Sequence, residues 1–559
     1  MKIMKLNIII LLLVAFSLVS CDEAFLDRYP KDQLSENNFW IQESDAEMFV
    51  NDMYGVFPDQ IMDKATDSDN AVHNVTWYEG DVSRGVYDPL NGAFSGEWSW
   101  DYNRIRKTNI FFENIDNIPD LDTEARKRLV GQAHFFRAYA YWDLLKVFAS
   151  EELNLGVPLI TKSLVISETY DVKRDSYDDC LTFMFDEYQN AVDNLPVEES
   201  EYGEDSHGRL TKGAALAMKA RAALFFNRFD IAEAAAKEVI NLNKYKLYDE
   251  DFDGDGLYPH DGDGDDYHAL FYIVPIGDPR KKEMILERQR VKDTYPYTWN
   301  TFQAPPPKGE GGVAPTQSFV DAFETINGLT INEDPSYDSA HPFNNRDPRL
   351  EVCVLHDGED WINVGDTVHV KTIPGVPPMG IGTDPGSTRT GYYNQKFLDP
   401  KDDMGGIDYH NTGFDWPIMR YAEVLLIYAE ARVQQGKIDG ETYDAINQVR
   451  NRVGMPDVDE SVYNNKDKLI ELLIRENRVE FGMEGKRWLD VRHYGKQYAF
   501  DHLNGQFYGM KYDPETQTPF VGDPIPAGVP REYQLHNILW PIPQDEINLN
   551  SNLVQNPGY

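Results

Sequence analysis

Apolar and small residues recur every three or four positions along much of this chain, which is the spacing of one face of an α-helix. Within residues 126–148 these positions are Leu129, Ala133, Phe136, Ala140, Leu144 and Phe148. Comparable spacing or composition predicts helices over residues 98–115, 211–226, 231–242, 420–435, 442–453 and 469–483. We therefore expect a mainly α-helical fold.

Small residues mark where these helices pack in pairs. Ala220 and Ala232 lie twelve positions apart with Phe229 between them. This arrangement resembles the tetratricopeptide pattern, in which small residues let two antiparallel helices approach closely. Residues 245–412 are instead rich in Gly, Pro, Asp and aromatic residues, which predicts loops and short strands laid over the helical scaffold.

The first 23 residues have the pattern of an export signal. Lys2 and Lys5 precede an apolar run over residues 8–19, which is too short to span a bilayer as a permanent helix. Cys21 at the end of the run resembles the bacterial lipobox. We expect residues 1–20 to be removed as a signal peptide and Cys21 to be acylated as a membrane anchor. The alternative is a secreted protein with a chance cysteine at this position.

Composition fits a large, acidic, exported body. The chain has 94 acidic and 53 basic residues and a formal net charge of −41, which disfavours nucleic acid and anionic lipid as partners. Its 559 residues, 41% of them hydrophobic, are ample for a sizeable core. Besides Cys21, the sequence contains Cys180 and Cys353, and it leaves open whether these two pair.

Several segments resemble the SusD/RagB family, in the same order as in that family. The C-terminal segments are WPIMRYAEVLLIYAEA at 416–431, INQVRNR at 446–452, RENRVEFGMEGKRWLDVR at 475–492, PIPQDEI at 541–547 and QNPGY at 555–559. The N-terminal half agrees at residues 25–30, 39–40 and 131–148, and residues 347–349 resemble the midchain tripeptide of the family. The resemblance covers essentially the whole mature chain.

This resemblance implies an outer-membrane lipoprotein on the cell surface. Such a protein captures an oligosaccharide or polysaccharide and delivers it to a SusC-like TonB-dependent transporter, and it is not an enzyme. The implied fold has tetratricopeptide-like helix pairs and an irregular remainder that carries the ligand surface. Asp22 and Glu23, directly after Cys21, resemble the signal that sends such lipoproteins to the outer face.

We expect one compact unit after the signal peptide, divided into three regions. These are an N-terminal helical region at 21–244, a loop-rich and partly β ligand-binding insert at 245–415, and a C-terminal region at 416–559.

Charged residues cluster in the C-terminal motifs, where they could be mistaken for a catalytic acid group. The set is Arg475, Glu476, Arg478, Glu480, Glu484 and Arg487. Arginines beside carboxylates lower the carboxylate pKa and favour permanent ionisation. We therefore predict a structural role for this set.

A sugar site requires exposed flat aromatic rings with polar side chains beside them, because a pyranose has apolar faces and polar edges. Five tryptophans lie inside the family motifs and are predicted to be core residues: Trp40, Trp142, Trp416, Trp488 and Trp540. The predicted ligand-binding residues are Trp77, Tyr78, Asp81, Arg84, Tyr87, Trp98, Trp100, Tyr295, Tyr297, Trp299, Asn300 and Trp361.

Three further expectations refine this set. Residues 77–87 and 295–302 are expected to meet in space. Trp98 and Tyr102 are one helical turn apart, so one of Trp98 and Trp100 should pack inside while the other faces outward. Strand alternation around Val364 and Val368 favours burial of Trp361, which makes it a weaker candidate.

Residues 251–256 match the front of a calcium-binding loop. Asp251, Asp253 and Asp255 stand at alternating positions before Gly256, so their oxygens can converge on one hard cation. Position twelve is Gly262 instead of the usual Glu, which argues against a complete EF-hand. The sequence leaves open a partial calcium site and a solvated acidic loop.

Other functional classes have less support. A glycoside hydrolase needs two placed carboxylates, and no local motif points to such a pair. The sequence has no HExxH, GxSxG or phosphate-binding glycine loop. A protein-interaction scaffold is disfavoured by the surplus of aromatic and loop-rich sequence. Capture of peptides by the same architecture remains an alternative to glycan capture.

Overall fold

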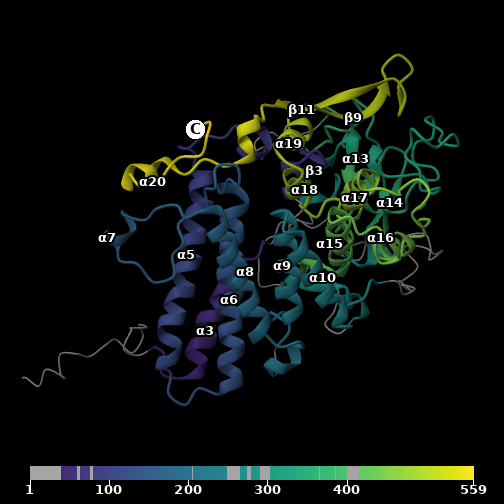
Figure 1. The fold of residues 1–559 in the computed structure, drawn as a ribbon. Coiled ribbons are helices and arrows are strands. Elements are labelled where there is room, and N and C mark those ends of the chain that lie inside the picture. The colour runs from purple at the N-terminus through teal and green to yellow at the C-terminus, as the bar shows by residue number, and fades with distance from the viewer. Residues whose placement is uncertain are drawn as a thin grey trace, which may run out of the picture.

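The computed structural model describes residues 39–58, 63–75, 80–203, 206–248, 265–272, 278–289, 302–363, 365–383, 386–399 and 414–559 (Figure 1). The α-helices are α3 Glu43–Met53, α4 Asp81–Arg84, α5 Gly92–Asn114, α6 Thr123–Phe148, α7 Ile166–Thr169, α8 Tyr177–Asn194, α9 Lys212–Phe225, α10 Phe229–Asn241, α11 Asp265–Ala269, α13 Gln317–Ala322, α14 Arg349–Cys353, α15 Tyr421–Gln434, α16 Gly440–Asn451, α17 Lys466–Glu480, α18 Arg487–His493, α19 Lys496–Leu503 and α20 Gln544–Leu549. Short 3-10 turns are η1 Tyr54–Val56, η2 Asp63–Asp67, η4 Ile115–Asn117, η5 Glu199–Tyr202, η6 Pro279–Lys282 and η7 Leu535–Ile538.

The strands are short. They are β1 Ala71–His73, β2 Met284–Arg288, β3 Val313–Pro315, β4 Val354–Leu355, β5 Asp360–Asn363, β6 Asp366–His369, β7 Tyr393–Asn394, β8 Trp416–Arg420, β9 Gly505–Asp513, β10 Thr518–Pro519 and β11 Asp523–Arg531. They form antiparallel pairs β1–β3, β2–β8, β4–β7 and β5–β6, and β9 pairs with both β10 and β11. The described part of residues 245–412 therefore contains the predicted loops and short strands, and also the short helices α11, α13 and α14, which were not predicted.

The helices pack in sequence order along the molecule. Helix α5 packs on α6, α6 on α8, α8 on α9, α9 on α10, α10 on α15, and α15 on α16 and α17. In Figure 1, α3, α5, α6 and α8 form the long bundle on the left, and α9, α10 and α15 continue it to the right. The contact of α10 with α15 joins the N-terminal helices to the C-terminal region. The predicted mainly α fold built from helix pairs is confirmed.

Local sequence signals begin the long helices. Asp122 caps α6 by accepting hydrogen bonds from the amides of Glu124 and Ala125, and Thr211 caps α9 through the amide of Ala214. Ala220 of α9 and Ala232 of α10 are fully buried and the two helices pack on each other, which confirms the predicted close pairing.

One large core joins distant parts of the chain. It contains residues from Trp40 to Leu553 and includes Trp142, Trp488 and Trp540, while Trp416 lies in a second cluster with Phe397 and Phe414. The five motif tryptophans are thus core residues, as predicted. Cys180 and Cys353 are buried free thiols, which answers the open question of their pairing. In the described part of the chain, no helix has the length and apolar character needed to cross a membrane.

Candidate functional site

A cleft of about 290 Å³ opens beside α5 and α6. We call it the Trp100 cleft and define it by Glu97, Trp100, Arg104, Asp143, Lys146 and Trp488, which are among its lining residues. Glu97, Trp100 and Arg104 follow one another at helical spacing on α5, so one face of that helix supplies one wall. Another wall comes from residues 484–486, which precede α18, from Trp488 and Leu489 of α18, and from Pro417 and Ile418 of β8.

Trp100 is the exposed aromatic residue of this cleft. Its side chain is 58% exposed, whereas Trp98 is 4% exposed and packs against Tyr102 and Phe148, with ring centroids 4.9 and 5.1 Å away. The prediction that one tryptophan packs while the other faces outward is confirmed. The prediction that Trp98 binds the ligand is therefore wrong, because its ring is buried in the core.

A glycine lies under the exposed ring. A Cβ atom added to Gly96 would lie 3.6 Å from the Trp100 indole, so the ring covers the turn of α5 that precedes it. One face of the indole therefore rests on helix backbone, while the side chain as a whole stays mostly exposed.

Ion pairs form the polar wall beside this ring. Arg104 donates a hydrogen bond to Asp101 at 2.6 Å and lies 3.6 Å from Asp143, and Lys146 also pairs with Asp143. Burial and the neighbouring charge of Asp143 raise the pKa of Asp101 well above its usual value. Glu97 makes no ion pair or hydrogen bond with any described residue. The cleft thus combines an apolar ring with both signs of charge and one uncommitted carboxylate.

The predicted residues of the 77–87 segment lie partly beside this cleft. Val82, between Asp81 and Arg84 in α4, lines the cleft, and Arg84 is exposed. The Asp81 carboxylate accepts a hydrogen bond from Asn91. Val82 and Trp100 therefore line the same cleft, although the prediction had paired residues 77–87 with residues 295–302.

Tyr87 lies behind the cleft instead of at its surface. Its ring is half-buried and packs 5.0 Å from Phe94 and 6.5 Å from Trp540, and Trp540 lines the cleft. Tyr87 therefore supports a wall of the cleft.

The prediction that Trp361 offers an exposed ring to a ligand is also wrong. It is fully buried on β5 and packs in a cluster with Val368, Leu355 and Met379. The expected strand alternation is present, because β5 pairs with β6 and directs Trp361 inward opposite Val368.

The remaining predicted residues lie outside the described residues. These are Cys21, Trp77, Tyr78, Asp251, Asp253, Asp255, Tyr295, Tyr297, Trp299 and Asn300. The anchor, the partial calcium site and the meeting of residues 77–87 with 295–302 therefore stay predictions. Within the described ranges, no group of three or more His, Cys, Asp or Glu side chains is arranged to hold a metal ion.

Sequence reasoning missed most of the cleft walls. Arg104, Asp143 and Lys146 were not singled out, and Trp142, Trp488 and Trp540 were assigned to the core although they also line the cleft. The spacing of Glu97, Trp100 and Arg104 was a local signal that could have identified the α5 wall. The walls contributed by residues 484–489 and Trp540 had no such signal, because they come from distant parts of the chain.

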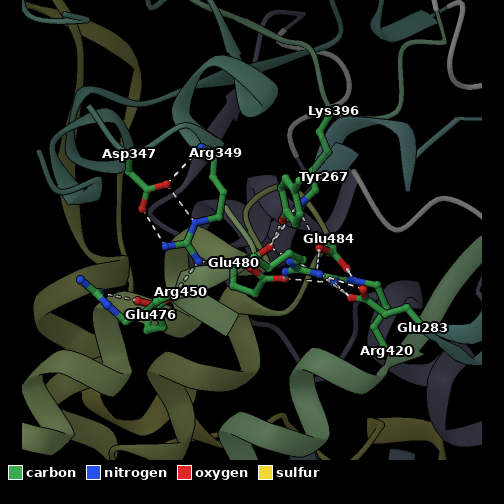
Figure 2. Close-up of polar contacts among 11 residues, drawn as sticks. Tyr267, Glu283, Asp347, Arg349, Lys396, Arg420, Arg450, Glu476, Glu480 and Glu484 are labelled. Atoms are coloured by element: carbon green, nitrogen blue, oxygen red, sulfur yellow. Dashed lines mark hydrogen bonds and ion pairs between the residues drawn. The ribbon is translucent and has the colours of Figure 1, made fainter. Parts of the chain in front are cut away.

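The charged cluster of the C-terminal motifs is a buried ion network (Figure 2). Arg349 donates to Asp347, Glu476 and Glu480, and Arg420 donates to Glu283, Glu480 and Glu484. Burial alone would raise the pKa of Glu480, but Arg452, Arg420 and Arg349 lower it below the usual range. Glu480 is therefore held ionised by arginines, and the buried ion pairs agree with the predicted structural role of this set.

Two family models match the chain. One, described as the SusD family, matches residues 280–559, and the other, described as starch-binding associating with outer membrane, matches residues 24–224. A SusD-like protein of Formosa agariphila is 25% identical over 88% of this chain and 91% of its own length. The starch-binding protein SusD of Bacteroides thetaiotaomicron is 24% identical over 81% and 76%, respectively.

Solved structures agree over nearly the whole chain. A SusD-like protein of Bacteroides fragilis superposes with a TM-score of 0.76 at 26% identity, covering 95% of this chain and 100% of that one. A SusD-like carbohydrate binding protein of the same species gives a TM-score of 0.75 at 26% identity, covering 92% and 100%. With a family model spanning residues 280–559 and this agreement in fold, the chain belongs to the SusD family.

Proposed function

We propose that this protein binds an oligosaccharide or polysaccharide at the Trp100 cleft. The observation that carries the proposal is the exposed Trp100 ring, which lies beside the charged side chains of Glu97 and Arg104. A pyranose ring can place its apolar face on the indole while its hydroxyl groups meet the charged wall. The printed names of two relatives, a starch-binding protein and a carbohydrate binding protein, support the same class of ligand.

The cellular setting follows from the N-terminal sequence and the family. We propose that acylated Cys21 anchors the protein at the outer membrane with its body on the cell surface, and that it delivers the glycan to a SusC-like TonB-dependent transporter. Anchoring beside the transporter would raise the local concentration of binding protein, so modest affinity could suffice. The description of the N-terminal family model, which names the outer membrane, supports this setting.

We propose capture without catalysis. Beside the exposed ring, Asp101 pairs with Arg104, and Asp143 pairs with Arg104 and Lys146. Of Glu97, Asp101 and Asp143, this leaves Glu97 as the uncommitted carboxylate. A glycosidase needs one carboxyl group to act as acid and a second to act as nucleophile or base. Capture of peptides by the same cleft is the alternative, and glycoside hydrolysis is a weaker one.

Replacing Trp100 tests the proposal. Binding of starch, laminarin and a peptide mixture would be measured by affinity electrophoresis and calorimetry. We expect Trp100→Ala to weaken glycan binding about tenfold, or ~1.4 kcal/mol, because the stacking surface is lost. Tyr170→Ala is the matched control, since Tyr170 is an exposed aromatic residue that does not line the cleft.

The outcomes separate the functional classes. Glycan binding that Trp100→Ala leaves unchanged would contradict the assignment of the site. Binding of peptides and of no glycan would favour the alternative ligand. Shortened chains or released sugars after incubation would show catalysis.

A further inference from the structure

A second cleft, of about 440 Å³, lies on the other side of the turn formed by residues 54–58. Val56 and Pro58 line the Trp100 cleft, whereas Tyr54, Gly55 and Phe57 line the second one. We call the second cleft the Arg209 cleft. The lining residues that matter here are Asn51, Tyr54, His207, Arg209, Glu287 and Arg288.

A strand pair also links the two clefts. Glu287 of β2 pairs with Pro417 of β8, and Arg288 pairs with Trp416. Pro417 lines the Trp100 cleft, while Glu287 and Arg288 line the Arg209 cleft. Neighbouring strands lie about 5 Å apart. Residues of this one strand pair therefore line both clefts.

The Arg209 cleft holds a guanidinium group without a carboxylate partner. Arg209 hydrogen-bonds the amide oxygen of Asn51, and its guanidinium carbon lies 5.7 Å from the centre of the Tyr54 ring and 5.9 Å from that of Tyr202. It forms no ion pair with any carboxylate in the described ranges. An arginine held in place by aromatic rings and an amide keeps its charge available for an anion.

The other charged side chains of this cleft are engaged with groups of the protein. Arg288 donates to the Tyr54 carbonyl oxygen at 2.7 Å. The carboxylate of Glu287 pairs with Lys281 at 2.7 Å, and Lys281 also pairs with Asp415 at 2.9 Å. His207 lies 3.1 Å from Glu199, and this hydrogen bond raises the pKa of His207.

We infer that the Arg209 cleft binds an anionic group of the glycan, either a uronic acid carboxylate or a sulfate ester, next to the sugar held at Trp100. The inference rests on the proposed function and narrows its ligand class to acidic polysaccharides. Arginine suits this task because its planar fork can donate two parallel hydrogen bonds to a carboxylate or sulfate group.

Matched polysaccharide pairs test the inference by calorimetry. One pair is polygalacturonic acid and its carboxyl-reduced form, and the other is κ-carrageenan and its desulfated form. We expect the acidic member of at least one pair to bind the unmodified protein about tenfold more tightly than its neutral form. The pair that shows this preference identifies the carboxylate or the sulfate as the recognised group.

Variants test whether Arg209 causes the preference for the acidic over the neutral polysaccharide. Arg209→Gln should abolish this preference, and Arg209→Lys should keep part of it. Asn51→Asp should also abolish it, because a carboxylate at the Asn51 position would neutralise Arg209 without removing it. Arg126→Gln is the control, since Arg126 is exposed, pairs with Asp116 and lines neither cleft. Circular dichroism and melting temperature would confirm that each variant is folded.

The results distinguish this inference from the proposed function. Trp100→Ala should weaken the binding of both polysaccharides of a pair by the same factor and leave the preference for the acidic one unchanged. Equal binding of acidic and neutral members, or a preference that survives both Arg209→Gln and Asn51→Asp, would overturn the inference while leaving glycan binding in place. Failure of every polysaccharide to bind would instead overturn the proposed function.

Discussion

Trp98 and Trp100 stand two positions apart on α5, yet one is 4% and the other 58% exposed. A helix advances about 100° per residue, so the two rings point away from each other. Trp98 is buried in the large core, and Trp100 lies exposed at the cleft. The periodicity of the sequence predicted this division but did not say which ring would be exposed, because that depends on which face of α5 meets α6.

At the residue scale, we expect the loss of Glu480 to lower the stability of the buried ion network most. It accepts hydrogen bonds from Arg349, Arg420 and Arg452 at 3.1, 3.0 and 2.5 Å, and it is fully buried. We expect Glu480→Gln to lower the free energy of unfolding by about 3–5 kcal/mol, because three buried guanidinium groups lose a common counter-charge. Urea denaturation would measure the change.

Glu471→Gln is the control for this substitution, because Glu471 forms an exposed pair with Lys468. We expect it to leave stability nearly unchanged, since exposed ion pairs are worth little. A loss for Glu480→Gln no larger than that for Glu471→Gln would contradict the assigned role of the network.

The lowered pKa of Glu480 also predicts how the free energy of unfolding depends on pH. Its pKa is lowered in the folded protein, so below the ordinary glutamate value of 4.5 the unfolded chain binds more protons than the folded one. The stabilisation is therefore complete above that value and is lost as the pH falls. In Glu480→Gln the decline of stability on the acid side should be shallower than in the unmodified protein, and an unchanged acid decline would argue against this role.

At the scale of elements, the end of α4 closely approaches the C-terminal segment. Gly85 has a φ of +73°, and a Cβ atom there would lie 2.4 Å from the amide nitrogen of Tyr533 and 2.6 Å from its Cα atom. We expect Gly85→Ala to lower the melting temperature strongly, because backbone atoms would have to move. Binding at the Trp100 cleft should weaken as well, since Val82 of α4 lines it.

Gly375→Ala isolates the effect of this close approach. Gly375 has a φ of +79° but no heavy atom within 4 Å of an added Cβ atom, so its substitution should cost only about 1 kcal/mol of conformational strain. Differential scanning calorimetry of both variants would compare them. Equal losses would show that the contact of α4 with Tyr533 contributes nothing further.

The elements differ in how well local sequence predicts them. Helices α6, α9, α10, α15 and α16 begin and end within about three residues of the expected bounds, because their apolar spacing and capping residues lie within the segment itself. The small sheets could not be placed in this way. Strands β1 and β3, or β2 and β8, are more than a hundred positions apart in the sequence, so their pairing depends on tertiary contacts.

At the scale of the whole molecule, the anchor and the binding site should be separable. We expect Cys21→Ala to release the protein from the membrane fraction, because acylation requires the cysteine thiol. The purified variant should bind polysaccharide as tightly as the unmodified protein. Fractionation with immunoblotting, followed by calorimetry, would check both. A variant that stays in the membrane would contradict the anchor, and one that loses binding would contradict the separation of roles.

The sequence by itself determined the mainly α fold, the family, the buried motif tryptophans and the structural character of the charged C-terminal cluster. These properties follow from spacing, composition and motifs that are local to each segment. Only the tertiary structure decided that Trp100 is exposed, that Trp98 and Trp361 are buried, and that Arg104, Lys146 and residues 484–489 share one cleft. The physical reason is that exposure and charge pairing depend on neighbours supplied by distant parts of the chain. The strand pair β2–β8 and the turn at residues 54–58 bring the Trp100 and Arg209 clefts together in the same way.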